Sequence, residues 1–166
     1  MTKQVRAEVP MQADVEIQRV TTSTTTPDDE QFERWINAVP GAGDSRFSLT
    51  IRIVDEQEAQ RFNREYRNRD YATNVLSFPS ELPEGLPVEL RQSQLGDILI
   101  CAPVVVREAL NQKRPEADHW AHLTIHGILH LLGFDHEQPD EAMAMESLET
   151  EILGKVGVSD PYLDLD

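Results

Sequence analysis

Two histidines stand four residues apart in the segment His126-Gly-Ile-Leu-His130. On a helix this spacing places both imidazoles on one face, about 6 Å apart, as two nitrogen ligands of one metal ion require. Gly133 can take a positive φ, end the helix and return the chain so that His136 approaches the same ion. Three protein nitrogens leave the fourth position of a tetrahedral site open to water. The spacing therefore predicts a hydrolase with one Zn²⁺ per chain on His126, His130 and His136, with Ni²⁺ as the alternative ion.

The spacing equals that of the metzincin peptidase signature, H-E-x-x-H-x-x-G-x-x-H, which makes a metalloprotease-like hydrolase the first alternative. Metzincins use the glutamate after the first histidine as a general base, whereas this chain has Gly127, which cannot accept a proton. Met143 and Met145 invite comparison with the methionine turn beneath the metzincin metal, but their helical surroundings favour core packing for both. Peptide hydrolysis by the usual route is therefore not expected.

Other polar side chains near the histidines are expected to support the site. Asp135 precedes His136 and either orients a histidine or caps the chain locally. His122 lies one turn before His126 and is expected to be a structural or supporting residue. His119 faces away from them and is expected to be exposed. The general base stays unassigned at this point.

Four strands and five helices are expected to position these residues. Alternating or continuous apolar residues predict strands at 14–18, 47–53, 74–78 and 97–101, with a loop over 79–96. A first helix begins at Pro27 with Thr26 as its N-cap and ends before Pro40, and a second follows a capping box of Asp55 and Glu58. Later helices are expected at about 103–112, 118–132 and 140–153, the last ended by Gly154. Most acids of the last segment are expected to form a solvated face: Glu137, Asp140, Glu141, Glu146, Glu149 and Glu151.

This order predicts an α+β fold with a single mixed four-stranded sheet packed with about five helices, in a metalloprotease-like arrangement around the metal-binding helix. The 166 residues suit one domain over 1–166, with about 1–12 as a flexible N-terminal extension. No segment suits a signal peptide or a membrane span, so we expect a cytoplasmic protein without a membrane partner. The single cysteine, Cys101, stands in an apolar run and is expected to be buried without a chemical role.

The charge balance limits how the chain can meet nucleic acid. With 30 acidic and 15 basic residues, the net charge of −15 disfavours nonspecific attraction over the surface as a whole. The best local candidate is the segment 61–69, where Arg61, Arg64, Arg67 and Arg69 oppose only Glu65. On charge alone, a solvated helix face is the simpler interpretation of this segment.

The metal motif also carries a more specific resemblance. The segment 126–136, HGILHLLGFDH, resembles the signature H-G-x-L-H-L-x-G-x-D-H of the YbeY family of endoribonucleases. The resemblance covers most of the chain from about Val15 onward, with Asn68 where glycine often follows the arginine of a Tyr-Arg motif. Further agreement lies in Tyr66-Arg67, in Asp70 and the segment 73–79, in 95–101, in 119–122 and in 160–162.

The resemblance implies a bacterial, cytoplasmic, single-strand-specific zinc endoribonuclease that acts in maturation of the 3′ end of 16S ribosomal RNA and in ribosome quality control. It implies ribosomal RNA and the ribosome or ribosomal proteins as partners, and no DNA is expected. In the family the arginine of the Tyr-Arg motif is an important active-site residue, and this position is Arg67. We therefore expect Arg67 and His126 to be catalytic, with Arg67 holding the scissile phosphate and Arg69 helping to bind substrate. A non-catalytic ribosome assembly factor with a structural metal is the second alternative.

Overall fold

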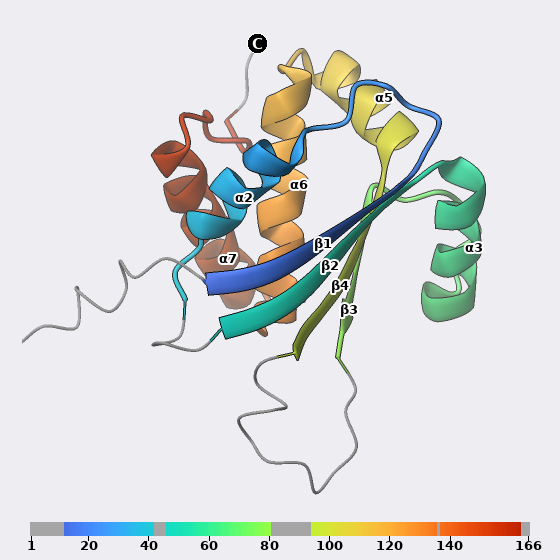
Figure 1. The fold of residues 1–166 in the computed structure, drawn as a ribbon. Helices are drawn as coiled ribbons and strands as arrows, with labels where there is room; N and C mark the ends of the chain where they lie inside the picture. Colours follow the sequence, from blue (N-terminus) through green and yellow to red (C-terminus); the bar gives the residue numbers. More distant parts are fainter. Residues whose placement is uncertain (1–11, 42–45, 81–93, 136, 164–166) are drawn as a thin grey trace, which may run out of the picture.

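The computed structural model describes residues 12–41, 46–80, 94–135 and 137–163. Within these ranges it contains one four-stranded sheet and five helices, which confirms the predicted α+β class (Figure 1). The strands are β1 (Gln12–Val20), β2 (Arg46–Val54), β3 (Val75–Pro79) and β4 (Gln94–Cys101). The helices are α2 (Asp29–Asn37), α3 (Glu56–Arg67), α5 (Ala102–Gln112), α6 (Glu116–Leu131) and α7 (Pro139–Lys155).

The sheet has the strand order β1-β2-β4-β3. β1, β2 and β4 are parallel, and β3 pairs with β4 in the antiparallel sense, so the sheet is mixed as predicted. Parallel neighbours need a crossover, and α2 supplies the one between β1 and β2. β3 is thus an edge strand. The predicted site residues Arg67, His126 and His130 lie near this strand.

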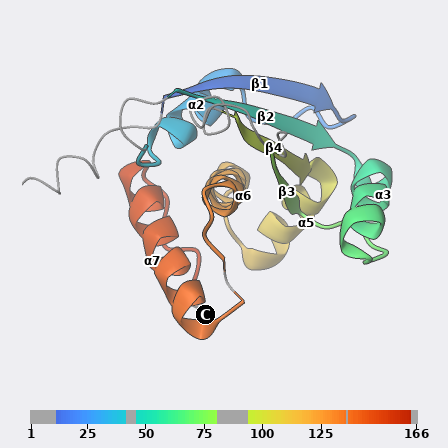
Figure 2. The same ribbon diagram turned by 90° about the horizontal axis from the view of Figure 1, so that it is seen from below.

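Alternate residues of the central strands build two cores on opposite faces of the sheet. Ile98 and Ile100 belong to the larger core, which includes Trp120 and Ile128 of α6, whereas Leu99 belongs to a smaller core. The smaller core packs under α3, and Figures 1 and 2 show α6 and α7 on one side of the sheet with α3 on the other. Because period-two alternation sends neighbouring side chains to opposite faces, β4 is buried on both sides.

Gly96 lies within β4, although the prediction placed it at the end of a loop. It has a φ of +140°, and a Cβ there would lie 2.3 Å from the backbone oxygen of Phe78. The register between β2 and β4 shifts at the same point, between Ser48 and Leu49. Only glycine fits this bulge, so here glycine marks close approach of two strands and not a strand boundary.

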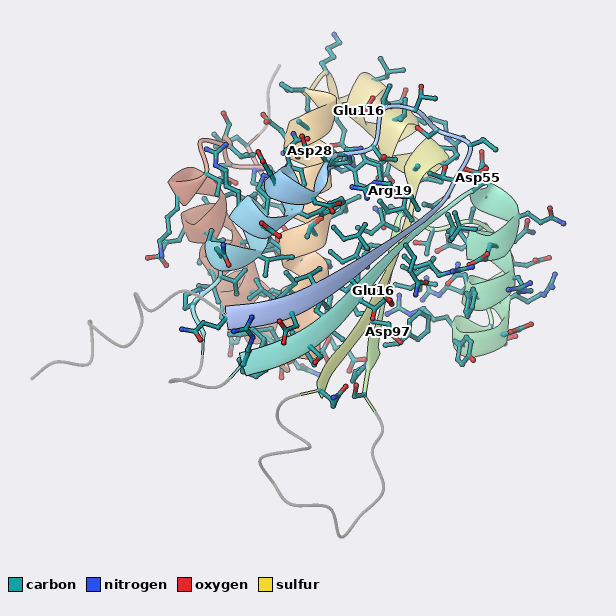
Figure 3. All side chains as sticks on the ribbon, viewed as in Figure 1. Glu16, Arg19, Asp28, Asp55, Asp97 and Glu116 are labelled. Atoms are coloured by element: carbon teal, nitrogen blue, oxygen red, sulfur yellow. The ribbon has the colours of Figure 1, made fainter. Side chains whose placement is uncertain are left out.

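One predicted helix cap was wrong, and a second was right in position but lacks the predicted capping bond. The N-cap of α2 is Asp28, labelled in Figure 3, and not Thr26. The Asp28 side chain accepts from the backbone N–H of Gln31 at 2.8 Å. Asp55 precedes α3 as predicted but makes no capping bond with its side chain. Asp55 instead accepts from the backbone N–H of Thr22 at 3.1 Å and from the hydroxyl of Thr21, which lowers the pKa of its carboxyl. A local capping pattern in the sequence cannot show that residues distant in the chain, here Thr21 and Thr22, donate to the carboxylate instead.

The remaining boundaries differ from the predictions by a few residues. α6 begins at Glu116, and α7 continues through Gly154 to Lys155, so Gly154 does not end it. Cys101 is fully buried as predicted, and burial raises the pKa of its thiol to about 11. Met145 is buried as predicted, whereas the prediction for Met143 was wrong, since it is 69% exposed. Among the helices of the described ranges, none is long and apolar enough to cross a bilayer.

Candidate metal centre

Helix α6 carries three histidines along one face, one turn apart, in a segment that otherwise packs into the core. The rings of His122 and His126 lie 6.1 Å apart, and those of His126 and His130 lie 4.5 Å apart. The His126 side chain is 22% exposed and that of His122 is 13% exposed. α6 therefore holds a row of imidazoles at the boundary between the core and solvent.

The two histidines of the predicted metal motif face one another through their Nε2 atoms. The distance between Nε2 of His126 and Nε2 of His130 is 3.0 Å. Two nitrogens bound to one tetrahedral zinc ion at its usual bond length lie about 3.3 Å apart. The pair is therefore already close to the separation that a shared ion requires.

The opposite nitrogens of both rings are engaged elsewhere. Nδ1 of His130 lies 3.1 Å from the backbone oxygen of Phe134, and Nδ1 of His126 lies 2.5 Å from Oε1 of Glu149. Carbonyl and carboxylate oxygens accept hydrogen bonds, so each Nδ1 carries the proton and donates it. Each Nε2 is left as a lone-pair donor, which is the form of histidine that binds a metal. This arrangement fits a zinc ion by its donor chemistry.

The end of α6 is closed by Gly133, with a φ of +103°. The N–H of Gly133 donates to the carbonyl of His130, and the N–H of Phe134 donates to the carbonyl of Leu129, both at 3.0 Å. These two bonds form a Schellman motif, which turns the chain back as the sequence predicted. The same turn presents the Phe134 carbonyl to His130. His136, the predicted third ligand, lies outside the described residues.

Glu149 of α7 is fully buried, which corrects its assignment to a solvated face. Its carboxylate accepts from His126, from Nε2 of His122 at 3.1 Å and from the hydroxyl of Tyr162. Burial alone would raise the pKa of this carboxyl, but the hydrogen bonds from the two histidines and Tyr162 outweigh it and hold the pKa at about 2. Burial and the hydrogen bond to this carboxylate raise the pKa of Tyr162, while burial lowers the pKa of His122.

Glu149 and Tyr162 were not singled out from the sequence, although Glu149 left a signal. It stands four residues after Met145 and three before Ile152, both of them buried, so an acid occupies a position of the apolar stripe of α7. An acid at such a position needs buried partners, and histidines on a neighbouring helix are suitable ones.

His126 belongs to two groups of possible metal donors. In one, His126 and His130 face each other through Nε2. In the other, donor atoms of His122, His126 and Glu149 all lie within 4.8 Å of one another, so this cluster could also hold a metal ion. The first group opens into a cavity, whereas the second is closed by its own hydrogen bonds around a fully buried carboxylate.

A cavity of about 810 Å³ joins the histidine pair to the arginine segment. Arg67 and Arg69 line it from the end of α3, and His126 and His130 line it from α6. Its remaining lining comes from β3, the loop before it and the turn after α6: Thr73, Asn74, Val75, Ser77, Pro79, Gly133, Phe134, Asp135 and Glu137. The predicted supporting residue Asp135 thus borders the cavity, while His122 lies behind His126 against Glu149.

The arginines of the segment 61–69 do not act as one surface. Arg64 lies 3.6 Å from Asp70, and the guanidinium of Arg61 lies over the ring of Phe62. Asn68, where the family often has glycine, has a left-handed φ of 57° and ends α3. Asparagine tolerates this conformation, so the helix can end there and direct Arg67 and Arg69 to the cavity.

His119, expected to be exposed, is 2% exposed. Its Nε2 lies 2.8 Å from Oε1 of Glu108 on α5, and the same oxygen accepts from the side-chain amide of Asn74 at 3.0 Å. Asn74 lines the cavity just before β3. The prediction was wrong because α5, a separate helix, covers this side of α6.

Gly127 has a packing role. A Cβ at this position would lie 3.1 Å from two side-chain atoms of Ile98 and 3.3 Å from Oγ of Ser77. Ser77 also donates to the Gly127 carbonyl at 3.0 Å, which ties β3 to α6. A glutamate of the metzincin kind would therefore point into the sheet, so the missing base at position 127 agrees with the local packing.

Together, the fold and site define a class: an α+β enzyme scaffold with a histidine-bearing helix beside an arginine-lined cavity. The family described as Endoribonuclease YbeY matches residues 14–157. A relative from Alkalilimnicola ehrlichii with that name is 53% identical over 90% of this chain and 90% of its own, and one from Halorhodospira halophila is 55% identical over 83% and 89%. A solution structure from Thermotoga maritima matches 89% of this chain and 99% of its own, with 22% identity and a TM-score of 0.49.

The chain belongs to the Endoribonuclease YbeY family. This confirms the resemblance found in the segment 126–136 and the prediction of a hydrolytic enzyme of the endoribonuclease class.

Proposed function

We propose that this protein is a single-strand-specific, zinc-dependent endoribonuclease that acts in maturation of the 3′ end of 16S ribosomal RNA and in ribosome quality control. The observation that carries the proposal is the shared cavity, in which Arg67 and Arg69 face the same space as His126 and His130. A phosphodiester needs both a positive group for its charge and an activated water, and this cavity brings together residues suited to each.

The proposed metal ligands are Nε2 of His126, Nε2 of His130 and His136, with one zinc ion per chain. When bound there, zinc would lower the pKa of a water molecule enough for it to lose a proton near neutral pH and attack a phosphoryl centre. Glu149 and the Phe134 carbonyl keep the protons of His126 and His130 on Nδ1. Support for zinc comes from the all-imidazole donor set, since carboxylate-preferring ions such as Mg²⁺ bind such sites poorly.

Arg67 is proposed to steady the scissile phosphate, with Arg69 as a second contact to the RNA backbone. A guanidinium donates two parallel hydrogen bonds to a phosphate, which fixes its orientation as well as its charge. Arg67 is the last residue of α3 and lines the same cavity that His126 and His130 line from α6. An unpaired strand is the proposed substrate because its bases can splay out into a pocket, whereas the bases of a duplex are stacked and paired.

The partners proposed are ribosomal RNA and the ribosome or its proteins, within the cytoplasm. The net charge of −15 makes basic ribosomal proteins suitable docking partners and leaves RNA contact to the cavity. The alternative is a non-catalytic ribosome assembly factor whose metal is structural. Measuring zinc content and RNA cleavage together separates it from an enzyme.

The test measures zinc content and cleavage of a single-stranded fragment of the 16S 3′ end for the wild type, His126→Ala, Arg67→Ala and Arg61→Ala. Arg61→Ala is the matched control, because Arg61 is on the same helix but borders a different hollow. We expect His126→Ala to lose both zinc and cleavage. Arg67→Ala should keep zinc and lose cleavage by about 10²-fold or more, as for removal of a group that stabilises the transition state. Arg61→Ala should match the wild type.

A zinc-loaded wild type that cuts no RNA above the His126→Ala background would contradict the enzyme and favour the assembly factor. Casein hydrolysis blocked by chelators would revive the metalloprotease. Cleavage by Arg67→Ala at the wild-type rate would remove Arg67 from the mechanism.

A further inference from the structure

The structure assigns to Glu149 a role in positioning the metal site: we propose that its carboxylate holds the His126 ring with Nε2 facing the cavity, and that Tyr162 and His122 hold the carboxylate. This inference rests on the zinc site of the proposed function. It concerns a residue on α7 that is not itself part of the cavity lining but contacts His126, which is.

The contacts of Glu149 divide between its two oxygens. Oε1 lies 2.5 Å from Nδ1 of His126. Oε2 lies 3.1 Å from Nε2 of His122 and accepts from the hydroxyl of Tyr162. An ionised carboxylate only accepts hydrogen bonds, so His126 must carry its proton on Nδ1. Glu149 therefore fixes the proton of His126 on Nδ1. The lone pair on Nε2 then points toward His130.

The burial of Glu149 shows why this geometry is rigid. The carboxylate has no exposed surface, and a buried charge is tolerated only where its hydrogen-bond acceptors are satisfied. Glu149 is on the side of α7 that faces α6, together with the buried residues Met145 and Ile152. Any rotation of His126 would break its bond to Oε1 and leave that oxygen unpaired in the core. Because an unpaired carboxylate oxygen in the core is unfavourable, the His126 ring keeps its orientation.

Tyr162 extends the same network to the segment after α7. Its hydroxyl donates to Glu149 and lies 3.3 Å from Nε2 of His122. The His122 and Tyr162 rings meet edge to face, with centroids 5.6 Å apart. His122 and Tyr162 thus fill the space around Oε2, so that the carboxylate keeps one orientation.

A different role for Glu149, as a direct metal ligand with His122 and His126, makes a different prediction. In that case the ion would replace the hydrogen bonds of the network, and loss of the carboxylate would remove a bond to the metal. A positioning residue, in contrast, leaves the number of ligands unchanged when it is replaced and lowers only the affinity.

The experiment measures the zinc dissociation constant by competition with a chromophoric chelator at pH 7, together with the thermal unfolding of the zinc-free protein. Glu149→Gln keeps the shape and can still accept from Nδ1 of His126, but it is a neutral and weaker acceptor. We expect this variant to bind one zinc ion with a dissociation constant raised about 10- to 100-fold. Glu151→Gln, exposed on the same helix, is the matched control and should bind zinc as the wild type does.

Tyr162→Phe provides a second test that does not depend on a change in the core, because Tyr162 is 44% exposed. It removes one donor to Glu149 and should raise the zinc dissociation constant about two- to tenfold, the effect of one hydrogen bond. Zinc affinity within twofold of the wild type for both Glu149→Gln and Tyr162→Phe would overturn the proposal.

Two further outcomes also decide the matter. If Glu149→Gln folds but binds no zinc at saturating concentration, as expected for His126→Ala, Glu149 is a direct ligand and the positioning role is wrong. If the wild type itself binds no zinc, the zinc site fails and this inference fails with it. Wild-type zinc binding with an unaffected Glu149→Gln rejects the positioning role alone.

Discussion

At the scale of single residues, Glu108 shows how a half-buried carboxylate can tie three elements together. It accepts from His119 on α6 and from Asn74 before β3, while it stands on α5. Burial raises the pKa of its carboxyl, but the bonds from His119 and Asn74 outweigh this and leave the pKa below its ordinary value of 4.5. The ionised form is therefore stabilised in the folded state.

This predicts an acid-dependent loss of stability that Glu108→Gln should reduce. A carboxyl with a depressed folded-state pKa contributes stability above its unfolded-state pKa, near 4.5, and loses that contribution as the pH falls through the folded-state value. Urea unfolding between pH 7 and pH 3 should show Glu108→Gln less stable than the wild type at pH 7 and a shrinking difference below about pH 4.5. Glu65→Gln, exposed on α3, is the control. A difference that stays constant over the range would contradict the assignment.

The i, i+4 spacing predicted His126 and His130 as ligands and the family resemblance predicted Arg67 as catalytic, but neither pointed to Glu149. The i, i+4 spacing is a local property, and the structure brings both histidines to one cavity with Arg67. Glu149 is one of six acids in one segment of sequence; its position in the apolar stripe of α7 is a weak signal of burial, and the packing of α7 on α6 establishes it. His119 was misplaced for the same reason, since its partner Glu108 is on another helix.

At the scale of elements, the turn after α6 is the part of the backbone that shapes the site most directly. Gly133 adopts a φ of +103° and makes one bond of the Schellman motif, and the following Phe134 carbonyl holds Nδ1 of His130. The cavity is lined by both residues of this turn. A shift of the turn would therefore disturb the metal site and the cavity together.

Gly133→Ala and Gly154→Ala form a matched pair with opposite expected effects. A Cβ would meet open space at both positions, but only Gly133 has a positive φ. Alanine at 133 should lower the free energy of unfolding by about 1–2 kcal/mol, the strain of a left-handed residue. Alanine at 154, inside α7, should raise it by up to about 1 kcal/mol through helix propensity. Chemical unfolding measures both, and equal signs would show that the backbone at 133 relaxes without strain.

Hydrophobic periodicity located every element of the described sheet, but capping chemistry was less reliable. β2 and α5 lie close to their predicted positions because apolar spacing reports burial directly. The cap predicted at Thr26 was wrong, and Asp55 is the N-cap of α3 without the predicted side-chain bond, because other donors and acceptors compete for these side chains. The strand order β1-β2-β4-β3 depends on contacts between distant segments, which periodicity does not encode.

At the scale of the whole molecule, a strongly acidic protein is proposed to bind RNA through a small basic region. The net charge is −15, while Arg67 and Arg69 line the cavity, Arg64 pairs with Asp70 and Arg61 lies over Phe62. Repulsion by the remaining surface opposes contact with RNA beyond the cavity. Few phosphates should therefore be neutralised in the complex.

The salt dependence of RNA binding tests this charge distribution. Two arginines that displace counterions from single-stranded RNA predict a slope of about −1.4 for the logarithm of the binding constant against that of the salt concentration. Fluorescence anisotropy with the inactive His126→Ala variant would measure the slope, and adding Arg67→Ala should make it shallower by about 0.7. A slope steeper than about −3 would mean that a wider basic surface takes part.

The buried carboxylate behind the metal helix also bears on how the protein is made. A polypeptide grows from its N-terminus, so His126 leaves the ribosome before Glu149, 23 residues later in the chain, and His122 leaves before Tyr162, 40 residues later. A nascent chain that ends before α7 contains His126 but lacks Glu149, the residue proposed to fix the His126 proton on Nδ1. With that role, the zinc site would reach its full affinity only late in synthesis, after α7 has packed on α6.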